Sequence, residues 1–153
     1  MTNSSFETNA TGWSTIAGAS LATVNSGSGI VAGDFCLEVG VTTSNQSGVQ
    51  YTLSSLTAST TYTLSVYITG ISGDLTAIGL REGDGAAGTR AMQTFSPNLT
   101  PGQTVRKSLT WTSSATPAGS IQIWRTGSAS SSGIFRVDAV MLEQGSSATA
   151  YNG

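Results

Sequence analysis

Apolar and polar residues alternate along much of the chain, and this pattern predicts half-buried β-strands. The clearest run covers residues 62–69 (YTLSVYIT), where the side chains at even positions are apolar or aromatic and share one face. Residues 105–112 (VRKSLTWT) and 120–125 (SIQIWR) repeat the pattern. The pattern predicts further strands at residues 3–7, 13–24, 35–42, 48–54, 74–82, 90–95 and 134–143.

Clusters of Gly, Ser, Asn and Asp separate these runs and predict turns. They lie at residues 26–29, 43–48, 83–88 and 127–133, and no long amphipathic helical stretch occurs between them. Many short strands with regularly spaced turns are typical of a β-sandwich or jelly roll. The sequence therefore predicts an all-β fold, an antiparallel β-sandwich formed by one domain over residues 1–153.

Composition agrees with a folded domain and excludes several partners. The 153 residues are 38% hydrophobic and 9% charged with a net charge of −2, which suits one buried core rather than disorder. The six Lys and Arg residues form no basic patch, so no nucleic-acid partner is expected. No apolar run approaches the roughly 18 residues of a membrane span. Residues 1–13 have neither a basic start nor an apolar stretch, so no secretory signal is predicted.

Catalytic groups are sparse, and we predict that the chain is not an enzyme. It has no His, which removes the usual base for Ser or Cys nucleophiles and the commonest zinc ligand. Two carboxylates would be enough for glycoside hydrolysis, but no spacing among the eight Asp and Glu residues singles out a pair. Cys36 stands alone in an apolar run, which predicts a buried structural thiol and no disulfide.

Three groups of residues form a recognisable order along the chain. Asn3, Phe6-Glu7 and Gly12-Trp13 open it, residues 37–70 (from LEVG to VYITG) form its centre, and residues 135–151 (FRVDAVMLEQGSSATAY) close it. This order resembles the carbohydrate-binding modules of families 4 and 9, the cellulase-type jelly rolls, in the form found in bacteriophage virion proteins. The resemblance implies a galactose-binding-like jelly roll and a non-catalytic module. The chain departs from the family at Thr104, Ala139 and Ala150, where a Trp, a second Asp and a Pro are common.

The resemblance also implies a structural calcium ion. It places the first and last strands close together, where related modules hold calcium with acidic side chains and backbone carbonyls. Glu7 and Asp138 are the corresponding residues of this sequence. Calcium takes six to eight oxygen ligands, which two carboxylates plus carbonyls can supply. The alternative is that both residues are ordinary polar groups at strand ends.

Sugar rings stack on aromatic side chains, and two aromatic residues are candidates for this role. Alternation turns Tyr67 and Trp124 away from the predicted core, Gln122 shares the face of Trp124, and Arg81 follows an apolar strand. Together these four residues are predicted to form an aromatic platform with polar arms. The alternative is that Tyr67 and Trp124 pack under a loop or against a neighbouring subunit. The remaining large aromatic residues considered, Phe6, Trp13, Trp111 and Phe135, are predicted to lie in the core.

Two functional hypotheses follow. In the first, the chain is a bacteriophage virion protein, a capsid decoration or tail component, that contacts other virion proteins and binds polysaccharide or cell-surface glycan. Its start at Met1 without a signal and its closing motif favour this hypothesis, which predicts location in the virion after assembly in the host cytoplasm. Symmetric assembly would make it a homo-oligomer. In the second, it is an excised carbohydrate-binding module of a secreted, extracellular polysaccharide-degrading enzyme.

Overall fold

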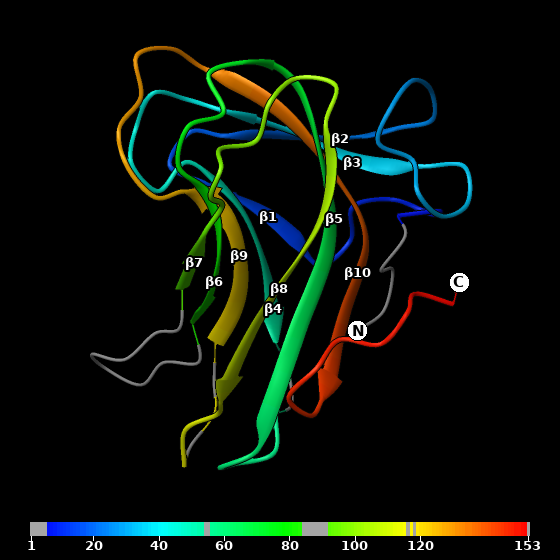
Figure 1. Cartoon of the computed structure of the whole chain (residues 1–153), viewed down its shortest axis with the longest axis vertical. Helices are drawn as coiled ribbons and strands as arrows, with labels where there is room; N and C mark the ends of the chain where they lie inside the picture. The colour runs from blue at the N-terminus through cyan, green and yellow to red at the C-terminus, as the bar shows by residue number, and fades with distance from the viewer. Residues whose placement is uncertain (1–5, 54–55, 84–91, 116, 118, 153) are drawn as a thin grey trace.

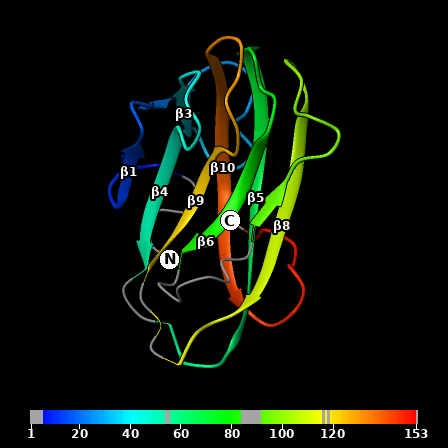
Figure 2. The ribbon, with the colours of Figure 1, turned by 90° about the vertical axis from the view of Figure 1, so that its left-hand side faces the viewer.

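The computed structural model describes residues 6–53, 56–83, 92–115, 117 and 119–152, and these form two stacked five-stranded sheets. We call the sheet with the order β1-β4-β9-β6-β7 the front sheet and the sheet with the order β2-β3-β10-β5-β8 the back sheet. All neighbouring strands pair antiparallel. In Figure 2, β9 and β6 of the front sheet pass in front of β10 of the back sheet. The predicted all-β sandwich is confirmed.

The chain crosses repeatedly between the two sheets, as Figure 1 shows. The front sheet consists of β1 (Trp13–Ile16), β4 (Gly48–Leu53), β9 (Gly119–Arg125), β6 (Ile78–Gly83) and β7 (Met92–Thr94). The back sheet consists of β2 (Ser20–Val24), β3 (Cys36–Val41), β10 (Gly133–Gln144), β5 (Thr61–Gly73) and β8 (Thr104–Thr112). Among the described residues, no helix is long and apolar enough to cross a membrane.

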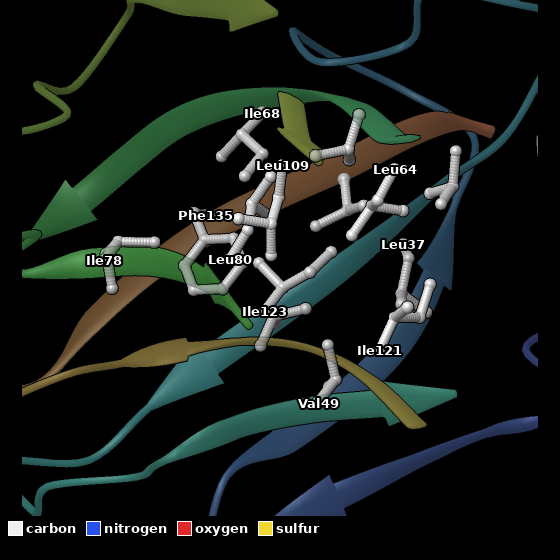
Figure 3. Close-up of a cluster of buried hydrophobic side chains, with 14 of the residues drawn as sticks. Leu37, Val49, Leu64, Ile68, Ile78, Leu80, Leu109, Ile121, Ile123 and Phe135 are labelled. Carbon is white, nitrogen blue, oxygen red and sulfur yellow. The ribbon is translucent and has the colours of Figure 1, made fainter. Parts of the chain in front are cut away.

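The core lies between the sheets and is made by the inward-facing half of each strand. In Figure 3, Leu64, Phe135 and Leu109 of the back sheet meet Leu80 and Ile123 of the front sheet. The alternation predicted at residues 62–69 is confirmed, because its apolar side chains all join this core. The four aromatic residues predicted for the core are also buried in it: Phe6, Trp13, Trp111 and Phe135. Burying a large apolar side chain stabilises the fold by about 1.5–3 kcal/mol.

Three predicted strands differ from the observed ones. Residues 13–24 form two strands, one in each sheet, because Ala17 and Gly18 take left-handed φ values of 47° and 74° and turn the chain between the sheets. Residues 74–77 form a turn before β6, in which Asp74 accepts a hydrogen bond from the Thr76 N–H (2.9 Å). The strand predicted at residues 3–7 falls partly outside the described residues, and its described part, residues 6–7, lies in no strand.

Candidate functional site

The outer face of the front sheet carries a polar row across its three central strands. The strand register places Gln50 of β4, Gln122 of β9 and Arg81 of β6 side by side. The Gln122 Nε2 donates a hydrogen bond to the Gln50 Oε1 (3.2 Å). Gln122 is only 9% exposed, and its Oε1 is shielded from solvent without a partner. Burying an unpaired polar atom costs about 1–3 kcal/mol, so this oxygen is a candidate for binding a ligand donor.

A second row lies beside the first and contains Trp124. Here the register places Trp124 of β9 between Gly48 of β4 and Gly79 of β6. A Cβ at Gly48 would lie 2.3 Å from the Ile123 carbonyl oxygen, and one at Gly79 would lie 2.6 Å from the Gln93 carbonyl oxygen. Both strands therefore need glycine to approach their neighbours at this level, and neither places a side chain beside the indole.

Arg81 covers the indole ring of Trp124. Its guanidinium carbon lies 4.6 Å from the ring centroid, which is a cation–π geometry. Trp124 is only 5% exposed, and its Nε1 is shielded without a hydrogen-bond partner. It does not belong to the core cluster, although its neighbours Ile121 and Ile123 do. The alternation pattern predicted correctly that the Trp124 side chain points away from the core. The face of the indole ring is not open to a sugar, however, because the Arg81 guanidinium lies over it.

Tyr67 does not join this group, and the predicted four-residue platform is wrong in that respect. Tyr67 belongs to β5 of the back sheet, where it pairs with Asp138 of β10 and Arg106 of β8. It is partly buried, and the Arg106 guanidinium carbon lies 5.5 Å from its ring centroid. The structure thus brings Arg81, Gln122 and Trp124 together and places Tyr67 on the opposite side of the sandwich.

Two segments of the chain cover parts of the outer face of the back sheet. The Arg136 Nη1 donates to the carbonyl oxygens of Ser26 and Ser28 (2.7 Å each), which holds the segment before β3 against β10. At the other end, the Arg106 Nη2 donates to the carbonyl oxygen of Thr149, and the Thr149 N–H donates to the Glu143 carboxylate (3.1 Å). On the outer face of the back sheet, these two arginines are thus engaged in holding segments of the chain itself.

Glu7 and Asp138, the two predicted calcium ligands, converge on one short segment. The Asp138 Oδ2 accepts hydrogen bonds from the N–H groups of Val31 (2.6 Å) and Ala32 (2.9 Å). The Glu7 carboxylate accepts from the N–H groups of Asp34 (2.9 Å) and Phe35 (3.1 Å). Between them lies a glycine, residue 33, where a Cβ would fall 2.3 Å from the Glu7 carboxyl carbon. The predicted proximity of the two acids is therefore observed.

Neither acid lies at a strand end, because Asp138 lies within β10 and Glu7 lies in no strand. Asp138 is fully buried, and burial raises its pKa, to which the nearby Glu7 charge adds. Phe6 and Ala139, the residues beside the two acids, have left-handed φ values of 60° and 47°, and such backbone strain is concentrated at functional sites. Among the described residues, no group of three or more His, Cys, Asp or Glu side chains forms a metal cluster. Further oxygen ligands would therefore be carbonyls or water.

A buried arginine, missed by the sequence prediction, supports the Trp124 end of the front sheet. Arg125 is fully buried, and its Nη2 and Nη1 donate to the carbonyl oxygens of Asp74 (2.6 Å) and Thr76 (3.3 Å). Its side chain points inward, in register with Ile121 and Ile123. The signal was present in the sequence, because alternation through residues 121–125 places a charged side chain at an inward position.

Comparison with known proteins gives one family match. The chain matches the family model CBM_4_9, carbohydrate binding domain, over residues 1–131. No curated protein matches it in sequence.

Solved structures share the fold at low identity. The CBM22-1 xylan-binding domain from Paenibacillus barcinonensis Xyn10C is 16% identical with a TM-score of 0.70, covering 94% of this chain and 93% of that domain. The CBM22-1–GH10 modules of a Clostridium thermocellum xylanase, complexed with xylohexaose, are 18% identical with a TM-score of 0.68, covering 92% of this chain but 28% of that one. A cyclase from Fischerella sp. TAU is 15% identical with a TM-score of 0.69, covering 97% of this chain and 98% of that one.

Proposed function

The chain belongs to the carbohydrate binding domain family CBM_4_9, and on that premise we propose that it is a non-catalytic module that holds a glycan on the outer face of the front sheet. The contact surface consists of Gln50, Gln122, Arg81 and Trp124. Its role is recognition by a rigid scaffold, because side chains fixed on paired strands lose little entropy when a ligand binds.

The unpaired amide oxygen of Gln122 is the observation that carries this proposal. Sugar hydroxyls both donate and accept hydrogen bonds, so one hydroxyl group can donate to this oxygen when binding displaces the groups that shield it. The shielded Trp124 Nε1, on the same face, can donate to another. A ligand that satisfies both atoms removes two costs of about 1–3 kcal/mol each from the free protein.

Substitution on the two faces of the sandwich tests the proposal. We expect Gln122→Ala and Trp124→Ala to weaken binding of the best ligand from a glycan array by tenfold or more, an estimate of about 1.4 kcal/mol per variant. The matched control is Tyr67→Ala, an aromatic truncation on the opposite sheet, which should bind within about twofold of wild type. Affinity is measured by calorimetry on variants whose circular dichroism shows a folded sandwich.

The opposite pattern would refute this site. Loss of binding in Tyr67→Ala with wild-type affinity in both front-sheet variants would move the site to the back sheet. No binding to any glycan would overturn the function itself. Because a cyclase shares the fold, the same samples are incubated with polysaccharides, and turnover would overturn the non-catalytic assignment.

For the biological setting, we propose a bacteriophage virion protein, a capsid decoration or tail component that contacts other virion proteins and is located in the particle. The closing motif at residues 135–151, which resembles the phage form of the module, supports this setting. Many copies on a particle would strengthen weak single contacts through avidity. The alternative is a module of an extracellular polysaccharide-degrading enzyme, and the xylanase whose modules share the fold supports it.

Particle association separates the two settings. The virion proposal predicts that the chain co-purifies with phage particles and forms a symmetric homo-oligomer in native mass spectrometry. A monomer that binds polysaccharide strongly and never associates with particles would favour the enzyme module instead.

We also propose a structural calcium ion between Glu7, Asp138 and the segment at residues 31–35. Two convergent carboxylates, one of them fully buried, support it. Burial, and to a smaller extent the charge of Glu7, raises the pKa of Asp138, and a divalent cation would favour its charged form. Bound calcium would stabilise the fold by about 2.7 kcal/mol at a hundredfold excess over Kd. Calcium should therefore raise the Tm, chelation should lower it, and Asp138→Asn should abolish the difference. A Tm that does not respond to calcium in the wild type would overturn the site.

A further inference from the structure

We propose that the outer face of the back sheet is a docking site for an acidic peptide segment of a partner protein, and that Arg106 binds a carboxylate of that segment. The chain's own residues 145–149 lie on this place in the structure. The site is on the opposite sheet from the proposed glycan site and takes a different class of ligand.

The guanidinium of Arg106 uses only part of the edge with which an arginine binds a carboxylate. The Nε and Nη2 atoms lie on one edge and can donate two parallel hydrogen bonds to a carboxylate. The Arg106 Nη2 donates to the Thr149 carbonyl oxygen, whereas the Arg106 Nε is shielded from solvent and has no hydrogen-bond partner in the described part of the chain. A neutral carbonyl group therefore lies where a carboxylate would satisfy both donors.

Arg136 shows the filled arrangement on the same face of the same sheet. Its Nε donates to the Glu38 Oε2 (2.9 Å), and its Nη2 lies 2.9 Å from the same oxygen. The chain thus supplies a carboxylate to this edge of Arg136, whereas Arg106 forms no ion pair with a described residue. We infer that the acid that pairs with Arg106 comes from another molecule.

The surface around Arg106 fits a peptide, because a segment of the chain already lies on it. The Thr63 Oγ1 donates to the Gly145 carbonyl oxygen (2.8 Å), and the Thr149 N–H donates to the Glu143 carboxylate (3.1 Å). Like the bond from Arg106, these contacts are made to main-chain groups, which every peptide offers. A sugar has no such series of amide and carbonyl groups, so the contacts favour a protein segment as the ligand.

The C-terminal segment is held loosely enough to be displaced. Of residues 144–152, only Ala148 and Tyr151 are partly buried, and the others are exposed. A segment with so few buried apolar groups opens at low cost in free energy. Thr63 and Ser65, which lie on the outer face of β5, are at most 1% exposed, so a partner segment would take over a surface that is otherwise covered.

Labelled peptides test the site by fluorescence anisotropy. Hexaglutamate is the probe, and hexaglutamine is its neutral control. The chain has a net charge of −2, so an acidic peptide gains nothing from the overall charge and depends on a local cation. Wild type should bind hexaglutamate about tenfold more tightly than hexaglutamine, as expected for hydrogen bonds to a charged group, and rising salt should reduce this preference.

Two substitutions on β8 assign the preference to Arg106. Arg106→Gln should remove the preference for hexaglutamate and should leave the affinity for the glycan at the wild-type value. Lys107→Gln removes the neighbouring cation, which points to the other face of the sheet and lies over the Phe95 ring, so this variant should keep the preference.

Loosening the C-terminal segment should strengthen peptide binding, because the apparent affinity depends on the fraction of molecules in which the site is open. Thr149→Pro removes the N–H that Glu143 holds and leaves every charge unchanged. It should raise the affinity for hexaglutamate by about threefold or more. Ala150→Pro, one position further along, removes an N–H for which the structure describes no hydrogen bond, and it should bind the peptide as wild type does.

Three results would overturn the inference. The first is equal binding of the two peptides by wild type and by Thr149→Pro, and the second is a preference that survives in Arg106→Gln. The third is a preference for oligogalacturonate over its methyl ester that exceeds the peptide preference and depends on Arg106, which would assign the site to an acidic glycan. None of these results affects the proposed glycan site on the front sheet, which the Gln122 and Trp124 variants test separately.

Discussion

Replacing Arg125 with Met should destabilise the sandwich strongly, although the substitution keeps most of the side-chain volume. Arg125 is fully buried, and its guanidinium donates to two carbonyl oxygens, those of Asp74 and Thr76. Its Nη1 also lies 3.7 Å from the Asp74 Oδ1. These contacts join the turn before β6 to the end of β9, so their loss affects two elements together.

The magnitude follows from the groups that the substitution leaves unpaired. Each carbonyl oxygen that loses its donor costs about 1–3 kcal/mol. Burial lowers the pKa of Arg125, which shows that desolvation of the charge opposes these gains, and a Met side chain removes that cost. The balance is a loss of about 3 kcal/mol in the free energy of unfolding. For a chain of this length it corresponds to a fall in Tm of roughly 6–12 °C.

Urea unfolding followed by tryptophan fluorescence measures this loss, with the slope m expected to stay unchanged. Arg125→Lys keeps a charge and fewer donors, so it should fall between wild type and Arg125→Met. Lys107→Met provides the control for removing a cation elsewhere and should change the stability by no more than about 0.5 kcal/mol. If Arg125→Met is destabilised by less than about 1 kcal/mol, desolvation offsets the hydrogen bonds and the reasoning is wrong.

Three further predictions concern a titrating loop contact, a thiol and two glycines. Hydrogen bonds from Thr76, and then from Ser130, hold the pKa of Asp74 well below its ordinary value. The stabilising effect of the ionised Asp74 is therefore present above about pH 4 and is lost as the pH falls further. Asp74→Asn should reduce the fall of the Tm at acid pH, and a fall equal to that of wild type would contradict this. Burial raises the pKa of Cys36 to about 11, so at pH 8 it should react with a thiol reagent only after unfolding, and rapid labelling of the native protein would count against the buried position. Gly48→Ala should cost about 1–3 kcal/mol because its Cβ would lie against backbone, whereas Gly127→Ala, where nothing lies within 4 Å, should leave the urea midpoint close to wild type.

Much of the fold could be predicted from the sequence because each strand of a sandwich buries one face. Residues 62–69 and 105–112 alternate clearly, and both lie within observed strands. Alternation failed at residues 13–24, where apolar side chains continue through a change of sheet. The left-handed conformation of Ala17 and Gly18 makes that change, and alanine gives no sequence signal for positive φ.

The site was predictable in part for a related reason. Alternation shows on which side of its own strand a residue lies, and it placed Trp124 and Tyr67 outward correctly. Alternation does not show which of the two sheets a strand joins. It therefore could not predict that Trp124 and Tyr67 lie on different sheets. The contact of Trp124 with Arg81 joins two different strands, and such a contact follows from strand order rather than from local pattern.

The outer faces of the sandwich, rather than the sandwich itself, carry the information about function. Xylan-binding domains and a cyclase share this fold with the chain at similar TM-scores, so the fold alone favours neither binding nor catalysis. On the back sheet, Arg136 and Arg106 are used to hold segments of the chain itself. On the front sheet, Arg81 lies over an aromatic ring beside an unpaired amide oxygen. Because unpaired buried groups cost stability unless a ligand satisfies them, replacing Gln122 or Trp124 on the front sheet should change glycan binding more than replacing Tyr67 on the back sheet.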